Sequence, residues 1–236
     1  DKKTDFNANL SLSDIDRLNK SNSYTQNLTP GNLFNRYDNA ESKSISKQQS
    51  LGSTVDHKVS ESFSYRLTPS IGISNGTSTN ESSSETFLPN GTKTNSNATR
   101  SSNETDATNF NNTLLLKKKF AKKGRTISST ITNGFNTSNS SGLQYTTQEF
   151  FSGGIKVKDS LLDQRNLRKG NTTTYSANVI YTEPLGKRSL LEMNAYLSQS
   201  IGSSSRKVYD KTINDDTGIL NTRLTNEFNS EYTYSG

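Results

Sequence analysis

Apolar side chains are scarce in this chain. The types Ala, Val, Ile, Leu, Met, Phe, Trp, Tyr and Cys make up 28% of its 236 residues, whereas ordinary soluble domains reach about 45–50% on a similar count. So little apolar material excludes a large dry core. Two classes of protein tolerate such a composition: a disordered or low-complexity exported chain, and a transmembrane β-barrel, whose apolar face contacts lipid and whose interior is polar.

Cysteine is absent, which excludes a disulfide framework and thiolate metal sites. His57 is the only histidine, so it has no His or Cys partner for a zinc site, and we expect it to be a solvated loop residue. No stretch is long and apolar enough for a transmembrane helix. The net charge is +6, but the basic residues form no stripe with interleaved aromatic residues, so we expect no nucleic-acid partner.

Apolar residues recur at alternate positions, which is the period of a strand with one apolar face. The stretch "YTEPLGKRSLLEMNAYL" (181–197) predicts a hairpin with one apolar face, for which the chain offers few packing partners. We therefore expect lipid to cover this face and the similar face near residue 115, which together carry Leu114, Leu116, Leu191, Met193 and Leu197. Such patterns predict about eight strands, around residues 6–12, 59–67, 71–73, 110–120, 127–135, 175–181, 191–201 and 220–234.

The predicted connections alternate between short and long. Short turns containing Pro or Gly are expected at 66–70, 120–125 and 183–188, and long loops at 14–54, 78–106, 138–170 and 202–217. Two of the long segments place Leu-x-Pro or Leu-Pro before a glycine, which suggests similar excursions capped by a turn. Within the third, "QEFFSGGIKVK" (148–158) predicts a small hairpin turning at Gly153-Gly154.

The spacing of aromatic residues fits the thickness of a membrane. Phe110 and Phe120 share a face and are ten residues apart, which corresponds to roughly 33 Å along a strand. For a strand tilted by ~45°, this is roughly 23 Å along the membrane normal. Barrel proteins of the outer membrane have an apolar band of about 25 Å. We expect an aromatic girdle at the lipid interface, formed by Tyr65, Phe120, Tyr181 and Tyr234.

The sequence thus predicts an all-β fold, an antiparallel transmembrane β-barrel segment of about eight strands with short periplasmic turns and long extracellular loops. Residues 1–236 are expected to form one partial barrel domain. Asp1 is not a natural start and no signal peptide opens the given sequence, so we expect a segment excised from a longer chain. No plug domain and no closing strand are recognised within it.

Three stretches resemble a known family: "YTEPLGKRSLLEMNAYLSQS", "LKKKFAKKGRTIS" and "YRLTPSIGISN". They are similar to the barrel of Bacteroidota TonB-dependent receptors, and more narrowly to the outer-membrane β-barrel family with a "YTEPL-K-S-LE" hairpin and a "KK-GR" turn. The resemblance covers roughly residues 54–236. It implies location in the bacterial outer membrane and import of a ligand captured by external loops, with energy delivered through TonB to a plug. Implied partners are outer-membrane lipid, the remaining barrel strands and plug, TonB indirectly, and a surface lipoprotein.

The chemistry-bearing residues indicate no catalytic site, cofactor or metal centre. No nucleophile, base and orienting group stand in a recognisable context, so we do not expect an enzyme. Asp210, Asp215 and Asp216 lack the spacing of a calcium loop, and a solvated acidic loop is favoured. Six basic residues surround one short turn, either contacting anionic headgroups or protecting a hairpin tip from edge pairing: Lys117, Lys118, Lys119, Lys122, Lys123 and Arg125.

Three functions remain open from the sequence. The first is part of a receptor or transporter barrel, in which strands are scaffold and external loops capture a ligand of unknown identity. The second is a surface adhesin or passive structural barrel without transport, and the third is a soluble Ser/Thr-rich exported β-protein. A plug domain in the complete protein would favour the first, and solubility without detergent would favour the third.

Overall fold

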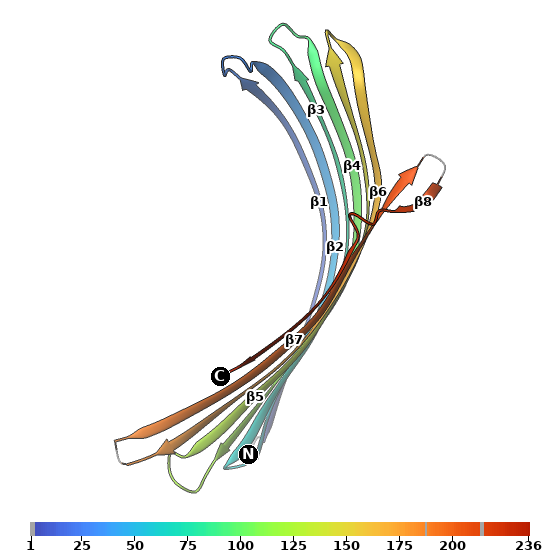
Figure 1. The fold of residues 1–236 in the computed structure, drawn as a ribbon. Coiled ribbons are helices and arrows are strands. Elements are labelled where there is room, and N and C mark those ends of the chain that lie inside the picture. The colour runs from blue at the N-terminus through green and yellow to red at the C-terminus, as the bar shows by residue number, and fades with distance from the viewer. Residues whose placement is uncertain (1–2, 187, 213–214) are drawn as a thin grey trace.

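The computed structural model describes residues 3–186, 188–212 and 215–236, and they form a single antiparallel sheet (Figure 1). Its strands follow chain order from β1 to β8, and β9 pairs with β7. The all-β antiparallel prediction is therefore confirmed. The strands are β1 (Thr4–Asn27), β2 (Phe34–Ser60), β3 (Phe63–Phe87), β4 (Lys93–Lys119), β5 (Thr126–Ser152), β6 (Ile155–Pro184), β7 (Leu190–Thr212), β8 (Asp215–Leu220) and β9 (Asn226–Ser235).

The sheet is one layer thick and has almost no interior. Within the described residues, Val208 is the only buried apolar side chain, and the sheet is open, because β1 pairs only with β2. The part of the chain that is described contains no helix with the length and apolar character needed to cross a membrane. A two-sheet sandwich with a dry core between its layers is not what these residues form.

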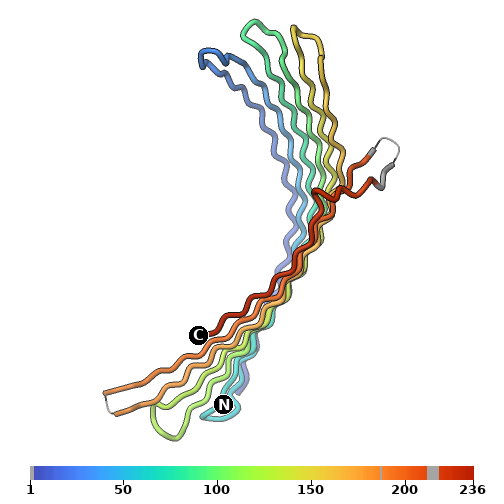
Figure 2. The backbone as a smooth tube through the Cα atoms, viewed as in Figure 1, coloured from blue at the N-terminus to red at the C-terminus, as the bar shows by residue number. Residues whose placement is uncertain are grey.

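The tips of the hairpins from β1 to β7 gather at two ends of a long, bent sheet (Figure 2). The proximal end contains the connections β2–β3, β4–β5 and β6–β7, and the distal end contains β1–β2, β3–β4 and β5–β6. Two of the predicted short turns are correct, since β4 ends at Lys119 before β5 begins at Thr126, and β6 ends at Pro184 before β7 begins at Leu190. Both lie at the proximal end.

The third predicted short turn, at 66–70, is wrong. The chain turns instead between Ser60 and Phe63, and Pro69 lies within β3. Proline cannot donate to a strand ladder, and the β2–β3 pairing is interrupted at this point, between the pairs Gly52–Ser70 and Val55–Leu67. Because β3 keeps its pairing with β4 through Pro69, the strand continues past the proline.

The long loops predicted at the other end are also wrong, because most of those residues lie in strands. The distal connections are short, the longest running from the end of β1 at Asn27 to the start of β2 at Phe34. Side chains from neighbouring strands pair across these segments: Lys20 Nζ lies 2.8 Å from Glu41 Oε2 and Lys43 Nζ lies 4.0 Å from Asp16 Oδ2. Backbone pairing and polar cross-strand contacts extend the sheet where no apolar alternation exists.

The distal tips use the turn chemistry that the sequence indicated. Asn32 N donates to Thr29 O at 2.9 Å around Pro30-Gly31, and Gly91 N donates to Leu88 O at 2.9 Å around Pro89-Asn90. Both glycines have positive φ, 83° and 82°. In β5–β6, Ser152 pairs with Ile155 and both Gly153 and Gly154 have positive φ, as a two-residue hairpin turn requires. The small hairpin predicted at 148–158 is thus the tip of a much longer one.

Candidate membrane-facing surface

One face of the sheet carries rows of apolar side chains that cross successive strands. The pairing registers align seven residues from β1 to β7 in one row: Leu10, Leu51, Ile71, Phe110, Phe135, Thr173 and Ile201. Four residues nearer the proximal end, a second row contains Phe6, Val55, Leu67, Leu114, Ile131, Ala177 and Leu197. We call this side the apolar face. Nothing in the described chain covers it, as the 67% exposure of Leu10 and 53% of Leu197 illustrate.

The apolar residues form a band of limited height. On β3 the band runs from Phe63 to Ile73, ten residues or roughly 33 Å along the strand. For a strand tilted by ~45° from a membrane normal, this length corresponds to roughly 23 Å along that normal. Beyond Ile73 the next position on the same face is Asn75, which is aligned with Asp106 on β4 and Lys47 on β2. The band therefore ends abruptly in charged and amide side chains on its distal side.

All five residues expected to face lipid lie on the apolar face. The registers pair Leu116 with Tyr65, Leu114 with Leu67, and Met193 with Tyr181. Leu191 and Leu197 are two and four residues from Met193 on β7, so they lie on the same face. The hairpin at 181–197 thus presents its apolar side to the same surface as the centre of the sheet.

Three of the four aromatic residues expected in a girdle lie together near the proximal edge of the band. Tyr65 and Tyr181 are on the apolar face, in adjacent rows. Phe120 follows β4, and its ring centroid is 6.4 Å from that of Tyr181 in an edge-on arrangement. These rings form a common layer across β3, β4 and β6.

Tyr234 departs from the expected girdle. Its partner on β7 is Ser198, so it lies on the face opposite Leu197, together with Tyr232 and Phe228. An alternation in sequence shows which residues of a strand share a face, but not which face of the sheet that is. The connection before β9, where Asn221 Oδ1 accepts from the backbone N–H groups of Arg223 and Leu224, joins the strand to β7 in this register.

The opposite side, which we call the polar face, is lined mainly by small polar residues at the level of the band. One row contains Thr68, Thr113, Thr132, Ser176 and Ser198, and Asn7 is paired with Thr54 on the first two strands. The glycines inside the long strands also lie on this face, and at Gly134 a Cβ would be 2.7 Å from Thr174 Oγ1. Leu115 and Ile180 are the main aliphatic exceptions on β1 to β7, and β9 adds the aromatic side chains of Phe228, Tyr232 and Tyr234 to this face. From β1 to β7 the two faces therefore differ in polarity at the level of the band.

Two amides interrupt the apolar band near its middle. Asn112 and Asn133 are paired across β4 and β5 on the apolar face. Asn112 Nδ2 donates to Asn133 Oδ1 at 3.4 Å, and Asn112 Oδ1 is buried without a hydrogen-bond partner. Their mutual hydrogen bond reduces the free-energy cost of placing amides among apolar neighbours, but Asn112 Oδ1 remains an acceptor without a donor.

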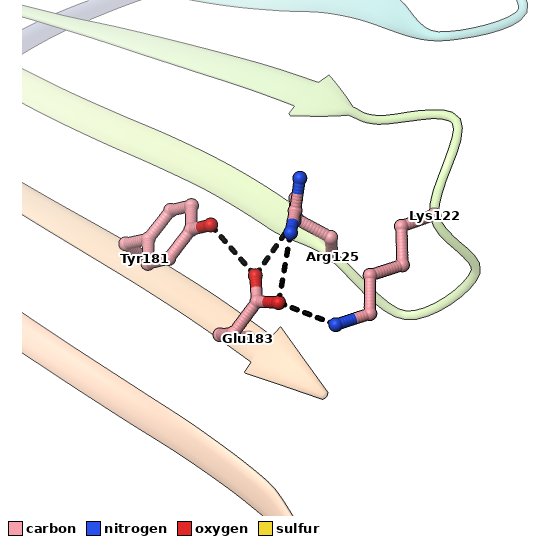
Figure 3. Close-up of polar contacts among 4 residues, drawn as sticks. All are labelled: Lys122, Arg125, Tyr181 and Glu183. Carbon is pink, nitrogen blue, oxygen red and sulfur yellow. Dashed lines mark hydrogen bonds and ion pairs between the residues drawn. The ribbon is translucent and has the colours of Figure 1, made fainter. Parts of the chain in front are cut away.

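A compact polar cluster joins two proximal hairpins (Figure 3). Glu183, near the end of β6, accepts from Arg125 Nε at 2.6 Å and Arg125 Nη2 at 2.8 Å, from Lys122 Nζ at 2.6 Å and from the Tyr181 hydroxyl at 2.7 Å. The Glu183 side chain is only 16% exposed. This cluster was not predicted from the sequence, although the carboxylate of "YTEPL" and the bases of "KKGR" were its visible signal.

The cluster lowers the pKa of Glu183 below its ordinary value, because Arg125, Lys122 and Tyr181 all donate to the charged carboxylate. Glu183 lies beyond Tyr181, outside the apolar band. A carboxylate with a lowered folded-state pKa stabilises the fold above its unfolded pKa of about 4.3, and this contribution is lost as pH falls through the folded-state pKa.

We therefore expect acid to weaken the native protein more than its Glu183→Gln variant, relative to the stability of each at pH 7. The measurement is the urea midpoint of the full-length protein in detergent micelles between pH 7 and pH 3. Glu61→Gln, which replaces a carboxylate whose side chain is 91% exposed at the β2–β3 turn, is the matched control and should retain the native profile. Parallel acid profiles for the native protein and Glu183→Gln would contradict the stabilising role of the cluster.

The other candidate residues form no group of metal ligands in the described chain. His57 lies within β2, not in a loop; its Nδ1 is 2.7 Å from Thr4 Oγ1 and its ring 5.3 Å from that of Tyr65. No group of three or more His, Cys, Asp or Glu side chains among the described residues could hold a metal ion. Asp210 accepts from Gln164 and Asn221, while the side chains of Asp215 and Asp216 lie outside the described residues.

The six basic residues of the proximal turn do not act as one group. Lys122 and Arg125 are bound to Glu183, and Lys118 Nζ lies 5.9 Å from the centre of the Phe63 ring. Lys117 and Lys119 are in β4, on the face opposite Lys118. Both interpretations of this turn, headgroup contact and protection of the hairpin tip, remain predictions.

Comparison of the chain with protein-family models, curated proteins and solved structures finds no match.

Proposed function

We propose that residues 1–236 form part of the wall of an outer-membrane barrel that takes up a ligand, with lipid against the apolar face and water against the polar face. The observation that carries this proposal is the band of roughly 23 Å on one face only. An open sheet with this band exposed to water would leave many large apolar side chains without cover, from Leu10 on β1 to Ile201 on β7.

The long distal part of the sheet supports a receptor role. On β3 a further fourteen residues follow Ile73 before the strand ends at Phe87, or roughly 46 Å of strand. Both faces of this part carry polar residues. It would stand outside the membrane as an extension of the wall, where a ligand is captured before it passes along the polar face; a plug and TonB would supply the gating and the energy.

A barrel without transport, serving as a structural element or an adhesin, is the alternative. The same extension would then present a surface for attachment. A plug domain in the complete protein favours the transporter, and an open, plug-free pore favours the alternative.

Cysteine labelling tests the two-faced wall, because the chain has no native cysteine. In the full-length protein folded into lipid vesicles, a water-soluble maleimide should label cysteines at 111, 113 and 115 but not at 110, 114 and 116. At 100–103, beyond the distal edge of the band, all positions should react. Equal labelling of odd and even positions between 110 and 116 would overturn the membrane assignment.

A further inference from the structure

Two arginines stand directly opposite each other on the polar face. Arg168 of β6 pairs with Arg206 of β7 in the sheet register, which places their Cβ atoms about 4.5–5.5 Å apart. They lie distal to the band, since Arg168 is three residues beyond Asn171, which shares the row of Ile73. Like charges directly opposite one another destabilise a sheet, so the stability of the fold does not explain this pair.

Neither arginine forms an ion pair with a carboxylate in the described part of the chain. Arg206 Nε is buried without a hydrogen-bond partner, and Arg206 Nη2 makes one long bond of 3.4 Å to Asn166 Oδ1. Asp210, a carboxylate on the same face of β7, lies four residues further along and already accepts from Gln164 and Asn221 at 2.8 and 2.7 Å. The guanidinium groups thus keep unused donors.

The arginines border an open hollow of about 580 Å³ on the polar face, within the range of small-ligand sites. Its other walls include Asn103, Ser140, Gly142 and Gly170. Ser140 Oγ donates to Asn103 Oδ1 at 2.8 Å, and Asn103 Nδ2 donates to Thr105 Oγ1 at 2.9 Å, which holds this wall in place. The glycines leave room beside the guanidinium groups.

We propose that Arg168 and Arg206 form a binding site for an oxyanion, a phosphate or carboxylate group, carried by the ligand of this barrel. A guanidinium presents planar, parallel donors that match two oxygens of such a group. An anion between the two arginines would relieve their repulsion and give Arg206 Nε an acceptor. The biological meaning of the site rests on the proposed function, because the polar face is then the path of the ligand.

Isothermal titration of the full-length protein in detergent micelles at low ionic strength, with inorganic phosphate and separately with citrate, tests the site. We expect saturable binding of at least one of these anions, and the stronger one distinguishes a phosphate from a carboxylate ligand. Affinity should fall at least tenfold in the Arg168→Gln/Arg206→Gln variant. It should also fall as salt is added, because the interaction is screened.

Arg165→Gln/Lys207→Gln is the matched control, since it removes the same charge from the same strands on the apolar-face side of the register. It should retain native affinity. Arg206→Lys keeps the charge but not the planar fork and should bind several-fold more weakly, which provides a second test if the double glutamine variant does not fold. Absence of binding by the native protein, or equal loss in the control, would overturn the site. Anion binding by a protein that does not associate with lipid would overturn the barrel function alone.

Discussion

Replacing Leu114 with Arg is expected to destabilise the full-length protein in lipid vesicles by about 2–4 kcal/mol, the cost of a lipid-facing arginine near the bilayer midplane. Leu114 pairs with Leu67, which is four residues from Phe63 and six from Ile73, so it lies near the middle of the band. The free energy comes from urea titrations of folding into vesicles.

Thr113→Arg is the matched control, because Thr113 directly precedes Leu114 on β4 and lies on the polar face. It is paired there with Thr68 of β3 and Thr132 of β5. Its cost should be much smaller, since the new guanidinium remains in water. Met193→Arg supplies a depth test. Met193 shares the row of Tyr181 at the proximal edge, where the cost falls to about 0–1 kcal/mol. Equal losses for Leu114→Arg and Thr113→Arg would mean that the faces are not lipid and water.

The two faces were readable from the sequence wherever one face is apolar. Leu114, Leu116, Leu191, Met193 and Leu197 were assigned to a common surface from alternation alone, because a strand repeats every two residues. The turn at 120–125 was visible through Gly124, which has a φ of 87°. In these regions, periodicity and turn chemistry point to the same register.

The distal half of the sheet was not predictable in this way. From residue 14 to residue 54, and again from 78 to 106, both faces carry Ser, Thr, Asn and charged residues, so no alternation distinguishes strand from loop. What holds these strands is pairing with neighbours distant in sequence, such as Asp14 with Lys47. The same limit hid the Arg168–Arg206 pair, since the two residues meet only through the β6–β7 register.

Proline and the last strand illustrate two further limits. Pro69 suggested a turn, but a strand tolerates proline where one ladder is interrupted, as it is between β2 and β3. Tyr234 was expected in the girdle, and its pairing with Ser198 places it on the face opposite Leu197, which the sequence of β9 alone could not indicate. Register between strands is a tertiary property.

The amide pair within the band gives the sharpest distinction between a lipid-covered and a water-covered apolar face. Asn112→Leu/Asn133→Leu removes both hydrogen-bonding partners together, so neither amide is left unpaired, and it also removes the unmet Asn112 oxygen. In a bilayer we expect stabilisation by about 1–3 kcal/mol, the usual cost of a poorly satisfied buried polar group. The measurement is the same vesicle-folding titration.

Asn109→Leu/Asn136→Leu is the matched control, because Asn109 and Asn136 are paired across the same strands on the polar face. There the leucines would be exposed to water, and Asn109 would lose its position over Gly72, so no stabilisation is expected. If water covered the apolar face, Asn112→Leu/Asn133→Leu would likewise add apolar surface to solvent, without a gain in stability and with lower solubility. Stabilisation by the first double substitution but not by the second therefore requires lipid on the face of Leu114 and water on the face of Thr113.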